Sequence, residues 1–314
     1  MSLEALTTPR SARDVLEWTR LTVTPHLQAA VAGLDAASRR IAEYQFEHGS
    51  YLRSALTVLA AEAVGGTADP RIVTAIELAH VHCELHDDVV HETRRGQATA
   101  WSHYGLESTV ETADELLEIA FHLLAGNGRA VRMLNTALLA VVDGVIEDAE
   151  TETPGPPDLA ACVRRATSAG ALMACACAMG TLSGGGSRAQ VEHLRAFGGH
   201  VGLVYQHVED LVGIWGEPRY ADLHRRRRSL PVVAAMTSGT REGRDLKTLY
   251  LADEPMDAQR AADLVDAAGG RTWSLHEIDG LLVRALQRLR AAEPGAKAAD
   301  ELFALARHAA RHDH

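Results

Sequence analysis

The first residues that suggest chemistry are two adjacent aspartates followed by two arginines. Asp87 and Asp88 end an apolar stretch, and Arg94 and Arg95 follow within one short segment. Adjacent carboxylates are hard oxygen ligands that hold Mg²⁺, and guanidinium groups bind phosphate oxygens through paired hydrogen bonds. A solvated helix end is the alternative for two aspartates alone. The apolar stretch and the arginines favour a site for a Mg²⁺–diphosphate complex.

A second acidic group lies much later in the chain. Glu209 and Asp210 stand among apolar residues, and Gln206 lies one helical turn before Asp210, on the same helix face. Carboxylates in such surroundings are costly unless they pair or bind a metal. Two acidic groups on separate apolar helices therefore suggest two walls of one metal-lined cavity.

The elements that must position these side chains are helices. Apolar residues recur with the period of a helix over almost the whole chain, and no stretch shows the alternation of a strand. The pattern predicts helices over residues 11–32, 35–47, 51–65, 70–92, 109–125, 128–150, 157–183, 187–215, 257–269, 273–293 and 296–312. Turn-rich segments at 65–70, 153–157 and 184–186 separate some of them. The helical pattern resumes on both sides of 153–157, so we expect one all-α domain over residues 1–314.

The composition limits the possible functions. The chain has 314 residues, 46% of them hydrophobic, which is enough for a large core. A formal net charge of −11 argues against a nucleic-acid partner. No stretch has the apolar length of a membrane span, and the N-terminus lacks the pattern of a signal peptide. We therefore expect a cytoplasmic protein.

Five segments, in order along the chain, resemble the trans-polyprenyl diphosphate synthase family. They are LRSALTVLAAEAVGG (52–66), ELAHVHCELHDDVV (77–90), RRGQATAW (94–101), GLVYQHVEDLVGIWG (202–216) and RRRRSLPVVAAMTSG (225–239). The resemblance implies the class I isoprenoid synthase fold, a single helical bundle with a deep central cavity and the two acidic helices across its mouth. An allylic prenyl diphosphate would ionise there with the help of Mg²⁺, in a pocket that excludes water. A homodimer is also implied.

The resemblance assigns the metal ligands residue by residue. Asp87, Asp88 and Asp210 match metal-binding aspartates of the family. Glu209 stands where an aspartate is usual, and Gln206 matches the glutamine that precedes the second motif. These residues are the expected catalytic and Mg²⁺-binding side chains.

The substrate-binding residues follow in the same way. Arg94 matches an arginine on the allylic diphosphate, whereas three residues match groups that hold isopentenyl diphosphate: Arg53, His80 and Arg95. The floor of the cavity, which would set the product length, matches His82 and Cys83. Neither is a large aromatic residue, so the resemblance implies a farnesyl, geranylgeranyl or longer product for an elongating enzyme.

This sequence departs from the family at its lysines. Ser50 replaces the lysine for isopentenyl diphosphate, Ser168 and Ala169 replace a Lys–Thr pair, and the loop after the second acidic group is shortened and lacks its lysine. Each desolvated ammonium–phosphate contact is worth about a few kcal/mol. The arginine run 225–228 is either a solvated basic turn, which we favour, or a replacement for this charge.

Three functions are compatible with these observations. We favour a terpene-synthase-like enzyme that cyclises or rearranges one allylic diphosphate, because the acidic groups remain while the lysines are lost. The first alternative is a chain-elongating prenyltransferase of the farnesyl or geranylgeranyl type, supported by Arg53, His80 and Arg95. The second is a non-catalytic regulatory subunit that pairs with an active homologue, supported by Glu209 and by His91 in the third position of the first motif.

Three histidines on one expected helix invite a separate metal-site interpretation. His80, His82 and His86 share the helix that ends at the first aspartates. Because no further ligands are evident nearby in the sequence, and His80 has a family position, we do not expect a metal site at these histidines.

Overall fold

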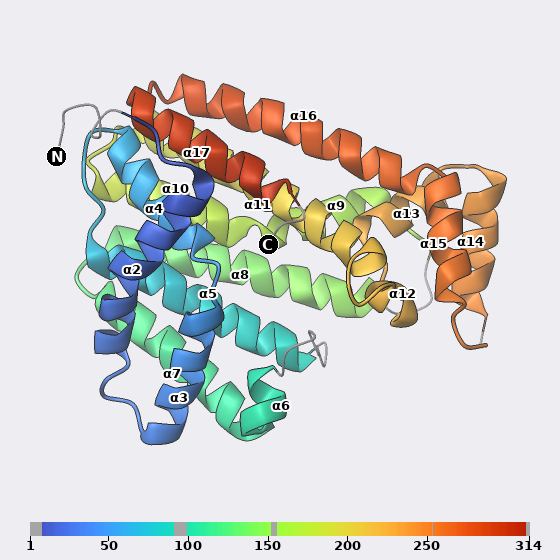
Figure 1. Ribbon diagram of the computed structural model, residues 1–314, viewed down its shortest axis with the longest axis horizontal. Helices are drawn as coiled ribbons and strands as arrows, with labels where there is room; N and C mark the ends of the chain where they lie inside the picture. The colour runs from blue at the N-terminus through green and yellow to red at the C-terminus, as the bar shows by residue number, and fades with distance from the viewer. Residues whose placement is uncertain (1–7, 91–98, 152–155, 253, 312–314) are drawn as a thin grey trace. The chain divides into compact units, whose positions relative to one another are not determined.

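The computed structural model describes residues 8–90, 99–151, 156–252 and 254–311. Every regular element in these ranges is a helix (Figure 1), which confirms the all-α prediction. The helices are α2 (Ala12–Ala30), α3 (Ala36–His48), α4 (Leu52–Ala63), α5 (Pro70–Val90), α6 (Ala100–Tyr104), α7 (Leu106–Leu123), α8 (Gly128–Thr151), α9 (Leu159–Ala169), α10 (Ala171–Ser183), α11 (Arg188–Trp215), α12 (Ala221–His224), α13 (Leu230–Thr237), α14 (Arg241–Leu251), α15 (Ala258–Ala267), α16 (Gly270–Ala291) and α17 (Ala296–Ala309).

Polar side chains mark several of the helix starts. The Asp35 carboxylate accepts hydrogen bonds from the Ala37 and Ser38 amides at the start of α3. At the start of α14, the Thr240 hydroxyl accepts one from Gly243. These caps satisfy amides that have no acceptor within their own helix, so the short polar residues fix where each helix begins.

The chain divides into two compact units, and the unit boundaries fall inside helices. Unit 1 comprises Met1–Thr136, Cys175–Gly198 and Arg288–Leu305, and unit 2 comprises Ala137–Ala174, Gly199–Gln287 and Ala306–His314. The expectation of one domain over residues 1–314 stays a prediction.

In unit 1, α5 packs against α2, α4 and α7 (Figure 1). Its residues from Ile72 to Val81 are all buried. A helix that is apolar on every face belongs in a core, because each face must find a partner. The core therefore fixes α5 along most of its length and leaves its last turns to carry the first acidic group.

In unit 2, α13 packs against α9, α14 and α15. All residues of α13 from Leu230 to Met236 are buried, and its Pro231 lies in the first turn, where a proline is tolerated. Around it, an apolar cluster includes Leu223, Val232 and Leu246. This core holds the segment that follows the arginine run.

The predicted helices differ from the observed ones in two ways. The single helix expected over 157–183 is broken at Gly170, where a Cβ atom would lie 3.1 Å from the backbone of Gly202. Helices α13 and α14 were missed, together with the short α6 and α12. The reason for α13 is physical, because a short and wholly buried helix shows no amphipathic period.

No single helix in the described part of the chain is long and apolar enough to cross a membrane. Only α9 and α10 taken together reach that length and composition, and they are bent by 42° at the break between them.

Candidate active site

The first acidic group, Asp87 and Asp88, lies in the last turns of α5. Asp87 is exposed, whereas Asp88 is only 9% exposed. The neighbouring Arg94 and Arg95, like His91, lie outside the described residues. The structure thus places the two carboxylates on a rigid helix, one facing solvent and the other facing inward.

Arg53 and His80, two of the residues expected to bind isopentenyl diphosphate, lie together in unit 1. The Arg53 guanidinium donates to His80 Nε2 at 2.7 Å, joining α4 to α5. Since arginine only donates, the imidazole accepts through Nε2 and carries its proton on Nδ1. The fold therefore holds the Arg53 side chain in one place, beside a buried imidazole ring.

Glu77 is a buried acid that the sequence analysis did not single out. Its carboxylate accepts a hydrogen bond of 2.6 Å from the Ser54 hydroxyl, and both side chains are fully buried. Burial raises the pKa of Glu77, although the Ser54 hydrogen bond and the nearby Arg53 charge oppose this shift. A charged residue one turn before His80 in an apolar helix was the available signal. Glu77 lies close enough to Arg53 for the charges of the two side chains to interact.

His82 and Cys83, the expected cavity floor, lie near the same end of α5. His82 is half-buried, and its Nδ1 lies 2.9 Å from the Ala113 carbonyl oxygen on α7. Burial raises the pKa of Cys83 to about 12, so its thiol stays protonated at neutral pH. Their role in setting product length stays a prediction.

In unit 2, Asp210 is held from two sides. It is 3% exposed, and its Oδ1 accepts a hydrogen bond of 2.8 Å from the Gln206 amide, as their spacing predicted. Its Oδ2 accepts another of 2.8 Å from the backbone amide of Leu230, the first residue of α13. An anion at a helix N-terminus is stabilised by the unpaired amides and by the helix dipole.

The electrostatic state of Asp210 follows from competing influences. Burial raises its pKa, and positive charge from Arg227, the Leu230 amide and the Gln206 amide oppose that shift. Glu209, its neighbour, is only half-buried. A cation near Asp210 would add to the groups that favour its ionised form.

Asp222 on α12 is a further acid that the sequence analysis missed. Its Oδ2 occupies the space beside Gly213, 2.3 Å from where a Cβ atom on that glycine would stand. Burial raises the pKa of Asp222 to about 6, while Arg227, 3.8 Å away, opposes the shift. Gly213 lies one turn after Asp210, so glycine at this position admits a carboxylate from another segment to the second acidic group.

The arginine run 225–228 is not simply a solvated turn. Arg225 is exposed, but Arg226 donates to the carbonyl oxygens of Leu249 and Tyr250 at 3.1 and 2.7 Å. Arg227 pairs with Asp222. The four arginines therefore have different surroundings, and Arg227 is the one whose charge acts on both Asp210 and Asp222.

Arg165 on α9 supplies more positive charge to this group. Its guanidinium donates to the Arg228 carbonyl oxygen at 3.0 Å, and its charge opposes the rise that burial causes in the pKa of Asp210. It lies one helical turn before Ser168, where the family's middle lysine is missing. The spacing from Ser168 was the signal that the sequence offered.

Comparison with known proteins decides the family. The family model described as "Polyprenyl synthetase" matches residues 35–268. The chain belongs to this family. Its membership confirms the expected isoprenoid synthase fold and the prediction of an enzyme that uses a prenyl diphosphate.

Relatives and solved structures agree with this assignment. The chain is 36% identical over 280 residues to a geranylgeranyl diphosphate synthase of Mycobacterium tuberculosis, covering 82% of this chain and 78% of that protein. A crystal structure of a polyprenyl synthetase from Streptomyces coelicolor is similar with a TM-score of 0.85 and 30% identity, over 95% and 99% of the two chains. A polyprenyl synthase from Caulobacter crescentus, crystallised with calcium and isoprenyl diphosphate, has the same fold at 23% identity, with a TM-score of 0.80 and coverage of 97% and 99%.

The favoured prediction of a terpene-synthase-like function is wrong. The M. tuberculosis relative is a chain-elongating enzyme by name, and the S. coelicolor structure is a polyprenyl synthetase. The error came from equating missing lysines with a missing second substrate. The absence of lysines does not show that positive charge is absent. Arg53 is held by His80, and Arg165 and Arg227 place guanidinium charge at the second acidic group.

Proposed function

We propose that this protein is a chain-elongating trans-prenyltransferase that adds isopentenyl diphosphate to an allylic diphosphate. The observation that carries the proposal is the Arg53–His80 hydrogen bond of 2.7 Å, since it preserves two groups that a single-substrate enzyme does not need. The similarity to a geranylgeranyl diphosphate synthase supports farnesyl diphosphate as the allylic substrate and geranylgeranyl diphosphate as the product.

We propose Mg²⁺ as the divalent cation, with Asp87, Asp88 and Asp210 as ligands and Glu209 as a further oxygen donor. Carboxylate oxygens are the ligands that this cation prefers. When bound, the cation would neutralise charge on the departing diphosphate. The C. crescentus structure contains calcium and isoprenyl diphosphate, which is consistent with a hard cation in the family.

The chain's own residues would then act by position and charge. The Leu230 amide and Gln206 keep the Asp210 carboxylate aimed in one direction. As the allylic C–O bond breaks, diphosphate leaves with the electron pair, and the double bond of isopentenyl diphosphate attacks the allylic carbon. The cation that results then loses a proton from C2 of the isopentenyl unit to the departing diphosphate, which restores a double bond in the longer chain. Preorganised groups accelerate such a step because they need no rearrangement as charge develops.

We further propose that Arg165 and Arg227 replace part of the missing lysine charge. Both act on the carboxyl group of Asp210, and Arg227 also pairs with Asp222. One guanidinium group binds two phosphate oxygens at once, whereas an ammonium group acts as a point charge. Fewer arginines than lysines are therefore needed. Replacing Arg165 with alanine should raise the KM for a diphosphate substrate by about tenfold.

We also propose that the protein is a homodimer, on the evidence of α8. Leu139, Val142, Val145 and Ile146 follow helical spacing on this helix and are between 40% and 55% exposed. A row of exposed aliphatic residues is typical of a protein–protein interface. Val142→Glu should convert the dimer to monomers in analytical ultracentrifugation. Leu21→Glu, at an exposed aliphatic residue of α2, should not.

The experiment for the proposed reaction is a substrate matrix. Purified protein with Mg²⁺ receives geranyl, farnesyl or geranylgeranyl diphosphate, each with and without isopentenyl diphosphate. Longer diphosphates should form only when both substrates are present, and chelation of the metal should stop the reaction. Hydrocarbon or alcohol from an allylic substrate alone, above the background without enzyme, would reject the proposal. So would an absence of turnover in every mixture.

A further inference from the structure

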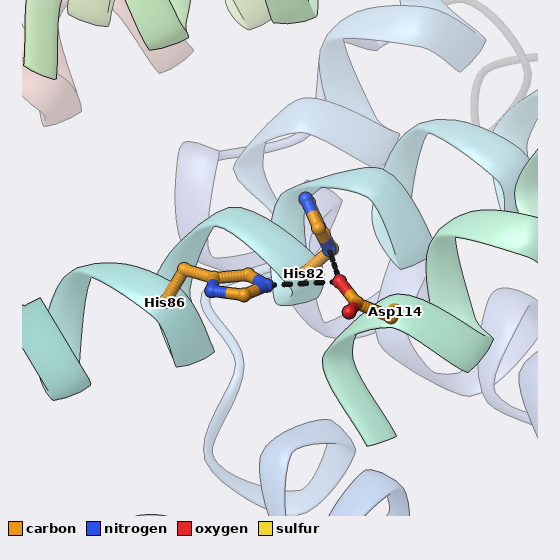
Figure 2. Close-up of side chains that lie close together, drawn as sticks. All are labelled: His82, His86 and Asp114. Atoms are coloured by element: carbon orange, nitrogen blue, oxygen red, sulfur yellow. Dashed lines mark hydrogen bonds and ion pairs between the residues drawn. The ribbon is translucent and has the colours of Figure 1, made fainter. Parts of the chain in front are cut away.

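Two histidines of α5 and one aspartate of α7 lie together in unit 1. Figure 2 shows His82 and His86, one turn apart on α5, facing Asp114 on the neighbouring helix. His86 Nε2 is 3.1 Å from Asp114 Oδ1, and His82 Nδ1 is 3.9 Å from the same oxygen. One ligand atom from each residue falls within a mutual distance of 4.8 Å. The sequence alone did not predict a metal site here, because Asp114 lies on a different helix from the two histidines.

We propose that His82, His86 and Asp114 form a site for a borderline transition-metal cation of the Zn²⁺ class. Imidazole nitrogens with one carboxylate oxygen suit Zn²⁺ or Co²⁺, whereas Mg²⁺ prefers oxygen ligands alone. With metal–ligand bonds of about 2.0–2.1 Å, ligand atoms of a tetrahedral site lie about 3.3 Å apart. The two measured distances lie on either side of that value, so small side-chain rotations suffice, and water would take the fourth position.

The surroundings of the three side chains are compatible with metal binding. Burial lowers the pKa of His82, which favours the neutral imidazole that binds a cation. The side chains are 16%, 35% and 66% exposed for His82, His86 and Asp114, so a cation has access from the Asp114 side. Binding through His82 Nδ1 puts the ring proton on Nε2 and releases the contact with the Ala113 carbonyl. That hydrogen bond is the interaction that the cation must replace.

Such an ion would join α5 to α7 beside the first acidic group. His86 directly precedes Asp87, so the ion would restrain the turn that carries the aspartates. It would differ from the cation of the proposed reaction in its ligands, because two of them are imidazole nitrogens and those of Mg²⁺ are carboxylate oxygens. The proposal therefore does not depend on what reaction the enzyme catalyses.

The test is a Co²⁺ titration of the full chain without an affinity tag, in excess Mg²⁺ and without substrate. Co²⁺ in a nitrogen–oxygen site has visible absorption bands that report its coordination. Because the C-terminal histidines His312 and His314 also bind such cations, all proteins carry His312→Ala and His314→Ala. One equivalent of Co²⁺ should bind, and Zn²⁺ should displace it.

Variants assign the ligands. His86→Ala and Asp114→Asn should each weaken Co²⁺ binding by about tenfold or more. Glu118→Ala is the matched control, since Glu118 is an exposed acid one turn after Asp114 on α7, and it should leave binding unchanged. Thermal unfolding in the absence of Co²⁺ verifies that each variant is folded. The proposed site would be overturned if the parent protein bound no Co²⁺. It would also be overturned if the His86 and Asp114 variants bound Co²⁺ as tightly as the parent protein does. Neither result bears on prenyl transfer.

Discussion

The two acidic groups differ in how the fold holds them. Asp87 and Asp88 end a helix that unit 1 buries along most of its length, and Asp87 itself is exposed. Asp210 is buried in unit 2, bonded to Gln206 and to the first amide of α13, with Asp222 nearby. The first group gains its position from one helix, whereas the second is assembled from three segments. Substitution by alanine should therefore affect catalysis alone in the first group, and both catalysis and stability in the second.

The largest expected effect is that of Asp87→Ala. Turnover should fall by about 10²–10³-fold, because a ligand for the charge-neutralising cation is lost. Stability should change by less than about 0.5 kcal/mol, since the side chain is exposed. Initial rates with farnesyl and isopentenyl diphosphates, together with urea unfolding, measure both quantities. Asp300→Ala, at an exposed acid of α17, is the control. An unchanged rate would reject the assigned ligand.

At Asp210, the effect on stability should depend on whether the new side chain keeps a hydrogen-bond acceptor, so we compare asparagine with alanine. Asp210→Asn keeps an acceptor for the Leu230 amide but removes the charge, so turnover should fall by about 10²-fold while the fold stays stable. Asp210→Ala leaves that buried amide without its acceptor and should lower the free energy of unfolding by about 1–3 kcal/mol. Equal stability of the two variants would contradict the role given to the hydrogen bonds.

Arg53→Ala tests the residue that we propose to bind isopentenyl diphosphate. The KM for isopentenyl diphosphate should rise by about tenfold or more, because a charge-assisted phosphate contact is lost. The KM for the allylic diphosphate should change little. Steady-state kinetics with each substrate varied in turn measure the difference, and Arg40→Ala, at an exposed arginine of α3, is the control. Equal changes in both values would place Arg53 elsewhere in the reaction.

Gly213→Ala probes how the second group is assembled. The added Cβ atom would collide with the Asp222 carboxylate, so we expect a loss of about 1–3 kcal/mol in the free energy of unfolding. Asp222→Ala removes the obstacle. In a double-mutant cycle, the cost of Gly213→Ala should largely vanish when Asp222 is already alanine. Additive effects would show that the two residues are not in contact.

The smallest expected effect is that of Glu77→Gln, at the buried acid that interacts with Arg53. Because burial raises its pKa in the folded protein, ionised Glu77 opposes folding, and stability falls as the pH rises above its ordinary pKa of 4.5. Glu77→Gln should therefore stabilise the protein at pH 7, with no gain at about pH 4. Thermal unfolding across this pH range measures it, with the exposed Glu118→Gln as the control. A constant difference at all pH values would reject the explanation.

The sequence revealed the parts of the molecule that depend on local pattern. The helical period predicted most helices, and the Gln206–Asp210 pair followed from their spacing alone. Asp222, Arg165 and Asp114 escaped notice because each reaches its partner from a different segment. The buried α13 was invisible because it has no polar face, although its first amide orients Asp210. Contacts of this kind are set by tertiary packing, which one sequence without its fold does not reveal.

The proposed reaction joins two substrates, and isotopic labelling distinguishes it from a reaction of one substrate. The protein is incubated with Mg²⁺, unlabelled farnesyl diphosphate and ¹³C-labelled isopentenyl diphosphate, and the products are identified by mass spectrometry. The parent protein should form a diphosphate that is one isoprene unit longer and carries the label, and Asp87→Ala should not form it. Products derived from farnesyl diphosphate alone, without label, would contradict the proposed reaction.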